Sequence, residues 1–181
     1  MSSATKTTIS AAFLELSKGK SIDKITVKDI VETCNITRQT FYYHFKDIMD
    51  VIEWSFQQRM EEILEKSLQV ASMQDAVRIL ISLVEEHTKI INKLMNSQKR
   101  EQTESLLIST IRAYMQGMID KKKLFLNMKR SDMEMALSFY SYAIVGVLLE
   151  ISSNRETVDL DMISRQICQL ISGEMFMEED I

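Results

Sequence analysis

The stretch Ile25–Asp47, "ITVKDIVETCNITRQTFYYHFKD", contains two short runs of helical periodicity separated by only a few residues. In the first run, Val27, Ile30, Val31 and Cys34 recur at the i, i+3, i+4, i+7 spacing that places side chains on one buried face of a helix. A tight turn must connect this helix to the one that follows. The stretch therefore predicts a helix-turn-helix unit.

Residues that begin and end helices support this reading. The Thr26 hydroxyl can cap the first helix, and Asp29 three residues later completes a pattern that resembles a capping box. Asn35 follows that helix and tolerates the left-handed backbone that a tight turn needs. Thr37 is placed to cap the second helix, which we expect to end near Phe45.

The second helix has two contrasting faces. At 100° per residue, Phe41, Phe45 and Ile48 fall on one apolar side. The rest of the helix carries donors, acceptors and aromatic rings in place of the Glu, Lys and Ala that usually form a solvated face. Arginine and glutamine can pair with base edges, while Tyr, His, Thr and Lys can hold phosphates, so this face predicts recognition of double-stranded DNA. Its members are Arg38, Gln39, Thr40, Tyr42, Tyr43, His44 and Lys46.

The whole chain of 181 residues is predicted to be all-α, because it has no proline and only four glycines for tight turns. We expect a helix-turn-helix domain over residues 1–46 and a helical effector and dimerisation domain over 47–181. A helix from about 47 to 70 connects the two. The other helices are expected at about 4–18, 73–95, 99–122, 131–153 and 158–177.

Composition and charge exclude several classes of protein. The net charge of −4 argues against a general nucleic-acid coat, although residues 1–50 hold seven Lys/Arg against six Asp/Glu. The two cysteines and two histidines lack metal-ligand spacing, so neither a metal site nor a cofactor is predicted. No unbroken apolar run reaches the length of a membrane span, and the N-terminus lacks a signal-peptide pattern, so we expect a soluble cytoplasmic protein.

The quoted stretch resembles the DNA-binding signature of the TetR family of bacterial transcriptional regulators. The resemblance covers roughly residues 5–54 and rests on the apolar spacing, the caps and the Phe-Tyr-x-His-Phe run. The Gln-Thr-Phe-Tyr variant, followed by Trp54, is similar to the branch that contains the dihydroxyacetone kinase operon activator. Two positions depart from the family pattern: Asn35 replaces the usual turn glycine, and Ile48 stands where many members carry a polar residue.

The resemblance implies particular DNA contacts and a homodimer that reads a palindromic operator. Base edges are expected to meet Lys28, Arg38 and Gln39, and Tyr43 could contact either bases or the backbone. The phosphate or sugar contacts are expected from Thr26, Thr40, Tyr42, His44 and Lys46.

The C-terminal region is expected to dimerise through the helices at about 131–153 and 158–177. The first of these, around "MALSFYSYAIVGVLLEI", is more apolar than the core face of one monomer needs. Control is expected either from a small apolar effector or, as the branch resemblance implies, from a co-regulator protein. The candidate effector pocket consists of Met95, Tyr114, Met118, Phe139 and Tyr142, which plain core packing would also explain.

The sequence is compatible with two other functions. The first is a protein-interaction module that keeps a helix-turn-helix fold without specific DNA binding, which the weak basic balance of residues 1–50 would suit. The second is an enzyme, but the sequence has no glycine-rich phosphate loop and no nucleophile motif, so no catalytic residue is predicted.

Overall fold

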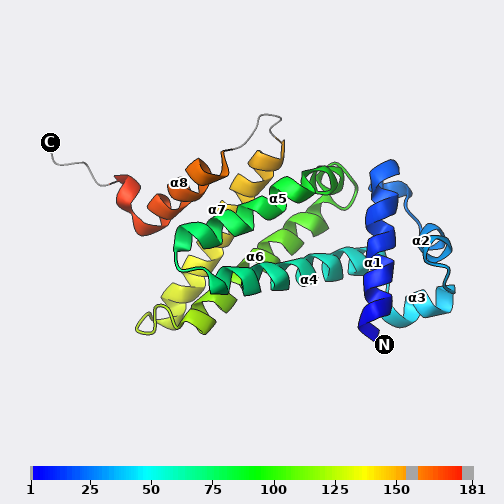
Figure 1. Ribbon diagram of the computed structural model, residues 1–181, viewed down its shortest axis with the longest axis horizontal. Helices are drawn as coiled ribbons and strands as arrows, with labels where there is room; N and C mark the ends of the chain where they lie inside the picture. Colours follow the sequence, from blue (N-terminus) through cyan, green and yellow to red (C-terminus); the bar gives the residue numbers. More distant parts are fainter. Residues whose placement is uncertain (1, 154–158, 177–181) are drawn as a thin grey trace. The chain divides into compact units, whose positions relative to one another are not determined.

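The computed structural model describes residues 2–153 and 159–176, and all regular structure in these residues is helical. Figure 1 labels helices α1 to α8 and colours the chain along the sequence, from blue at the N-terminus to red at the C-terminus. They are α1 (Ser2–Gly19), η1 (Ile22–Lys24), α2 (Val27–Cys34), α3 (Arg38–His44), α4 (Ile48–Gln69), α5 (Met73–Met95), α6 (Arg100–Lys122), α7 (Arg130–Ser153), α8 (Leu160–Ser172) and η2 (Glu174–Phe176). The predicted all-α class is confirmed.

The chain divides into two compact units. Unit 1 consists of Met1–Met60 with Lys89–Thr110, and unit 2 of Glu61–Thr88 with Ile111–Ile181. The long helices α4, α5 and α6 contribute residues to both units. Unit 1 therefore joins the helix-turn-helix to a segment more than 40 residues further along the chain.

The core of unit 1 is built from the apolar positions that helical spacing indicates. The most deeply buried are the aromatic rings of Phe13, Phe41 and Phe45, each at most 2% exposed. Side chains from two later helices, Leu94 of α5 and Leu106 of α6, belong to the same cluster. Since an aromatic side chain buries 150–250 Å², these rings fix how α1 and α3 pack.

Polar caps also hold the later helices of unit 1 to α1. Lys93 of α5 donates hydrogen bonds from Nζ to the carbonyl oxygens of Ser17, Lys18 and Lys20 at the C-terminal end of α1. These are the carbonyls that a helix end leaves without internal partners. Helix α1 ends at Gly19, within one residue of the expected end, and this glycine does not take the left-handed conformation of a C-cap. The donors at this helix end come from the distant Lys93.

The core of unit 2 includes a buried polar pair. The hydroxyl of Tyr114 on α6 donates to Ser67 Oγ of α4 at 2.9 Å, and both residues are buried. Burial raises the pKa of Tyr114 above its ordinary value, while the bond to Ser67 opposes that shift. Helix α4 also approaches α6 closely at Gly117, where an added Cβ would lie 2.8 Å from a methyl carbon of Leu64 and that side chain would have to shift.

Helix α7 is longer and more apolar as a whole than its unbroken apolar run indicates. Within the described part of the chain, it is the one helix whose length and composition would allow it to cross a membrane. Serine and tyrosine interrupt its apolar run without adding charge, so the helix as a whole remains apolar although no unbroken run is long. One side of α7 is nevertheless buried in the protein, through Leu137, Ser141, Val145, Leu148, Ile151 and Ser152.

Candidate nucleic-acid interface

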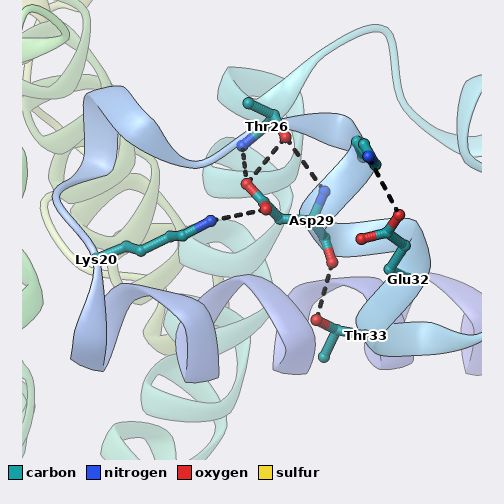
Figure 2. Close-up of polar contacts among 6 residues, drawn as sticks. Lys20, Thr26, Asp29, Glu32 and Thr33 are labelled. Atoms are coloured by element: carbon teal, nitrogen blue, oxygen red, sulfur yellow. Dashed lines mark hydrogen bonds and ion pairs between the residues drawn. The ribbon is translucent and has the colours of Figure 1, made fainter.

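The first helix of the candidate site is begun by a full capping box, as predicted. Thr26 Oγ1 accepts from the Asp29 backbone N–H at 3.2 Å, and the Asp29 carboxylate accepts from the Thr26 backbone N–H at 2.9 Å. Lys20 Nζ adds an ion pair with Asp29 at 2.7 Å (Figure 2). Two orphan amide groups are thereby satisfied, and α2 begins at a defined residue.

Asp29 is held ionised by these neighbours. The hydrogen bond from Lys20, followed by those from the backbone and hydroxyl of Thr26, lowers the pKa of its carboxyl group from the ordinary 3.8 to about 2. The same residue accepts a bond at its backbone oxygen from the Thr33 hydroxyl, one turn later (Figure 2). Asp29 therefore organises both the start and the first turn of α2.

The turn between α2 and α3 has the backbone that the sequence predicted. Asn35 lies in the left-handed region, with φ 53° and ψ 47°, where asparagine is tolerated better than most residues. The Ile36 N–H returns to the Val31 carbonyl at 3.0 Å, which satisfies one of the last acceptors of α2. The Thr37 hydroxyl then accepts from the Thr40 N–H at 3.1 Å and caps α3.

Helix α3 presents its polar side to solvent. Phe41 is fully buried, whereas Tyr42 is 57% and Tyr43 is 83% exposed. Arg38 and Gln39 are exposed at the start of the helix. The apolar side therefore packs into unit 1, while aromatic planes and hydrogen-bonding groups remain free to meet a ligand.

The remaining candidates lie around this face. Thr40 and His44 are half-buried, and the His44 ring meets the Tyr43 ring edge to face at a centroid distance of 5.0 Å. Lys46 is exposed and directly follows the last buried ring of the helix, and its backbone N–H donates to Asp50 at 2.9 Å. Lys28 is exposed on α2, next to the exposed cap Thr26.

Sequence reasoning missed the residues that hold this module to the rest of unit 1. The Asp23 carboxylate in η1 accepts from the backbone N–H of Gln98 at 3.1 Å, close to the start of α6. Lys93 caps α1 in the same region. Their partners lie more than 70 residues away in sequence, so no local pattern could have revealed either contact.

The five effector-pocket candidates are not alike in their surroundings. Tyr114 is buried and Met118 is half-buried, both in unit 2. Phe139 and Tyr142 are each 65% exposed on α7, which is not the setting of residues that line an enclosed cavity. Met95 is half-buried and belongs to unit 1.

An open cavity of about 370 Å³ lies in unit 1 and includes none of the effector-pocket candidates. Apolar side chains of η1 and α4 and polar groups near the start of α6 form its walls. The lining residues are Ile22, Asp23, Ile25, Ile48, Gln98, Lys99, Glu101 and Gln102.

Comparison with known proteins places this geometry in a family. Residues 9–53 match the model of bacterial regulatory proteins of the tetR family, and residues 71–173 match that of a transcriptional regulator C-terminal region. A relative from Lactococcus lactis, the HTH-type transcriptional activator DhaS of the dhaKLM operon, is 27% identical over 90 residues. That match spans 50% of this chain and 48% of the relative's length.

Solved structures share the fold over nearly the whole chain. The dihydroxyacetone kinase operon activator DhaS aligns with a TM-score of 0.69 at 21% identity, covering 94% of this chain and 95% of that one. A protein from Listeria innocua aligns with a TM-score of 0.71 at 17% identity, covering 94% and 90%. The TetR family repressor AlkX from a Dietzia species aligns at 0.59 and 11% identity, covering 92% and 95%.

The two family models confirm the resemblance inferred from the sequence, and the second alone covers more than half of the chain. The matched families contain transcriptional regulators and not enzymes, which removes the catalytic alternative. This chain therefore belongs to the TetR family of bacterial transcriptional regulators.

Proposed function

We propose that this regulator acts in the cytoplasm as a homodimer that binds palindromic operator DNA through α3. The observation that carries the proposal is the contrast within one seven-residue helix. Phe41 is fully buried, while Tyr43, two positions on, is 83% exposed beside other groups that can hydrogen-bond to DNA. A short helix with one buried side and one polar side can enter a major groove.

The roles of individual side chains follow from their chemistry and place. Arg38 and Gln39 are exposed in the first turn of α3, and Lys28 is exposed on α2. We assign these three to base edges, because Arg and Lys suit guanine and Gln suits adenine. Tyr43 can reach either bases or backbone, and phosphate or sugar contacts are assigned to Thr26, Thr40, Tyr42, His44 and Lys46.

Twofold pairing is supported by the exposed apolar side of α7. Met135 is 71% exposed and Phe139 and Tyr142 are each 65% exposed, at spacings that place them along one side of the helix. Helix α8 adds Met162 and Leu170, at 47% and 44%. Several large apolar side chains exposed along one side of a helix are typical of an interaction site. A dimer would cover it and would present two copies of α3 to successive major grooves.

The test is selection of bound sequences from random DNA by the purified protein, followed by titrations of the selected site. A palindromic site is expected. Gln39→Ala should change the preference at particular base pairs by about 1–3 kcal/mol. Lys46→Ala and Tyr42→Ala should weaken binding to all sequences, and Lys46→Ala should reduce the slope of log affinity against log salt by about 1.

Lys89→Ala is the matched control, since Lys89 is exposed outside the helix-turn-helix. It should leave affinity, base preference and salt slope as they are in the wild type. If Gln39→Ala retains the wild-type base preference, the assignment of direct readout to Gln39 is wrong. If no DNA is enriched, the chain is a protein-interaction module and the main proposal fails.

We also propose that the C-terminal region controls operator binding, through a small apolar effector or a co-regulator protein. Tyr114 and Met118 are the pocket candidates that are buried or half-buried in unit 2. Any such controller must have different affinities for the DNA-bound and free states. A compound or protein that binds unit 2 yet leaves operator affinity unchanged in a purified system is not that controller.

A further inference from the structure

The segment that runs from the last two residues of α6 through the connecting loop to the first residue of α7 has an unusual composition. Residues 121–130, "KKKLFLNMKR", contain five basic residues and no acidic one, although the whole chain carries a net charge of −4. Elsewhere in the sequence no ten-residue window holds more than three Lys or Arg. Positive charge is therefore concentrated in one short segment of an acidic protein.

The centre of this segment is apolar and exposed. Leu126 is 78% and Phe125 is 59% exposed, and Leu124 and Met128 are each 41% exposed. Three lysines precede these residues, and Lys-Arg follows them. The loop thus places large apolar side chains between two groups of cations. This layout differs from a solvated loop, in which large apolar residues are few.

The backbone of the loop makes one hydrogen bond to the end of α6 and one within itself. The Leu124 N–H donates to the Ile119 carbonyl at 3.0 Å, and the Met128 N–H donates to the Phe125 carbonyl at 2.9 Å. Lys123 and Phe125 both have positive φ, at 52° and 56°, which is uncommon for residues with large side chains. Two residues of the segment therefore adopt a left-handed backbone conformation that costs free energy. They lie in the turns that carry its exposed apolar side chains.

We propose that the loop formed by residues 121–130 is a docking site for the surface of an anionic lipid bilayer. An anionic bilayer has a layer of phosphate charge above an apolar interior. Cations on both sides of an apolar tip match those two layers, with the lysines at the phosphates and Phe125 and Leu126 below them. The contact goes beyond operator binding and involves none of the residues assigned to DNA.

Other occupants match the loop less well. A nucleic acid offers negative charge but no apolar layer for three consecutive large side chains. A protein partner would need a surface well beyond ten residues, because stable interfaces bury about 1,200–2,000 Å² in total. A lipid surface needs neither a matching groove nor a large footprint, since charge attraction and insertion of a few side chains suffice for reversible binding.

The test is co-sedimentation of the full chain with vesicles of phosphatidylglycerol mixed with phosphatidylcholine, against vesicles of phosphatidylcholine alone. We expect binding to the mixed vesicles only, and release by added salt. Leu126→Ser should weaken that binding about tenfold, and so should the combined Lys121→Gln, Lys123→Gln and Lys129→Gln variant. Lys122 is left in place because its Nζ also donates to the Val70 carbonyl at 3.0 Å.

Two variants serve as controls. Met73→Ser removes another exposed apolar side chain, 49% exposed at the start of α5, and should bind the mixed vesicles as the wild type does. Arg38→Gln removes a proposed DNA contact and should also bind normally. The vesicle assay contains no DNA, so its outcome is independent of operator binding. A negative vesicle result would contradict only the lipid proposal, and a negative operator result would contradict only the DNA-binding proposal.

A second measurement locates the contact. On binding to mixed vesicles, the fluorescence of a Leu126→Trp variant should shift to shorter wavelength and be quenched by bromine-labelled lipid. A Met73→Trp variant should show neither change. The wild type gives the background signal of the native Trp54. The proposal is overturned if the wild type ignores mixed vesicles, or if Leu126→Ser binds them normally. It is also overturned if Leu126→Ser breaks a dimer in sedimentation equilibrium, which would assign the loop to a second copy of the chain.

Discussion

At the scale of single residues, Asp29 shows how much one half-buried carboxylate can organise. It accepts from Lys20 Nζ, from the Thr26 backbone and from the Thr26 hydroxyl. The capping role was readable from the spacing of Thr26 and Asp29 alone, because a capping box is a local pattern. The contact with Lys20 could not be predicted in this way, since Lys20 lies nine residues earlier and approaches Asp29 only when α1 and α2 pack together.

We predict that Asp29→Asn lowers the melting temperature near neutral pH, because the charge that Lys20 and the Thr26 amide stabilise is lost. The pKa of Asp29 is lowered from 3.8 to about 2. A lowered folded-state pKa stabilises the protein above the unfolded value and stops doing so as pH falls through the folded one. The difference between variant and wild type should therefore shrink between about pH 4 and about pH 2.

Thermal unfolding followed by circular dichroism across this pH range measures the effect. Glu32→Gln on the same helix is the matched control. Its carboxylate pairs with Lys28 at 3.7 Å, with both side chains about two-thirds exposed, and such pairs contribute little. A constant Asp29→Asn deficit down to pH 2 would contradict the link between the ionised carboxylate and stability.

At the scale of elements, α3 depends on its N-cap. A helix of seven residues has few internal hydrogen bonds. The cap bond from the Thr40 N–H to the Thr37 hydroxyl is therefore a large share of the hydrogen bonding that stabilises α3. We predict that Thr37→Ala lowers the free energy of unfolding by about 1 kcal/mol. Urea denaturation followed by circular dichroism measures this change.

The same variant should also bind operator DNA more weakly, whatever the base sequence, because a frayed α3 no longer presents its polar side as one surface. Thr37→Ser keeps a hydroxyl at the cap and is expected to behave as the wild type in both measurements. If Thr37→Ala unfolds at the wild-type urea concentration, the cap does not hold α3 in place and this account of the helix start is wrong.

Helix ends also show which features can be predicted from neighbouring residues in the sequence and which cannot. The starts of α2 and α3 and the left-handed Asn35 were predicted correctly, since each is set by neighbouring residues. The end of α1 was predicted to within one residue, but its capping by Lys93 of α5 was not predicted. The free carbonyls at a helix end can be capped by any donor that the fold brings near. The sequence around Gly19 therefore does not indicate that Lys93 caps α1.

At the scale of the whole molecule, the exposed apolar side chains of α7 are the basis on which we expect a dimer. Phe139 and Tyr142 were predicted to line an effector pocket, but each is 65% exposed, and they extend the apolar surface assigned to the dimer. Sequence periodicity finds an apolar position without showing which of its neighbours covers it. Spacing alone therefore could not separate a pocket from an interface.

We predict that Phe139→Asp converts the dimer to a monomer, because a charged carboxylate buried between two copies would be strongly unfavourable. Sedimentation equilibrium measures the change, and operator affinity should fall with it, as one α3 cannot span two major grooves. Met73→Asp, at another exposed apolar position of unit 2, should leave the assembly unchanged. A Phe139→Asp protein that remains dimeric would place the interface elsewhere.

The sequence by itself determined the helical class, the caps and turn of the helix-turn-helix and the polar side of α3. All of these follow from contacts within about four residues, where periodicity and cap chemistry operate. Only the tertiary structure decided that Lys93 and Asp23 tie the N-terminal helices to α5 and α6, that Phe139 and Tyr142 are exposed, and that the loop at 121–130 displays its apolar residues. Those outcomes depend on which distant segments pack together, because burial is a property of the packed chain and not of a residue's sequence neighbours.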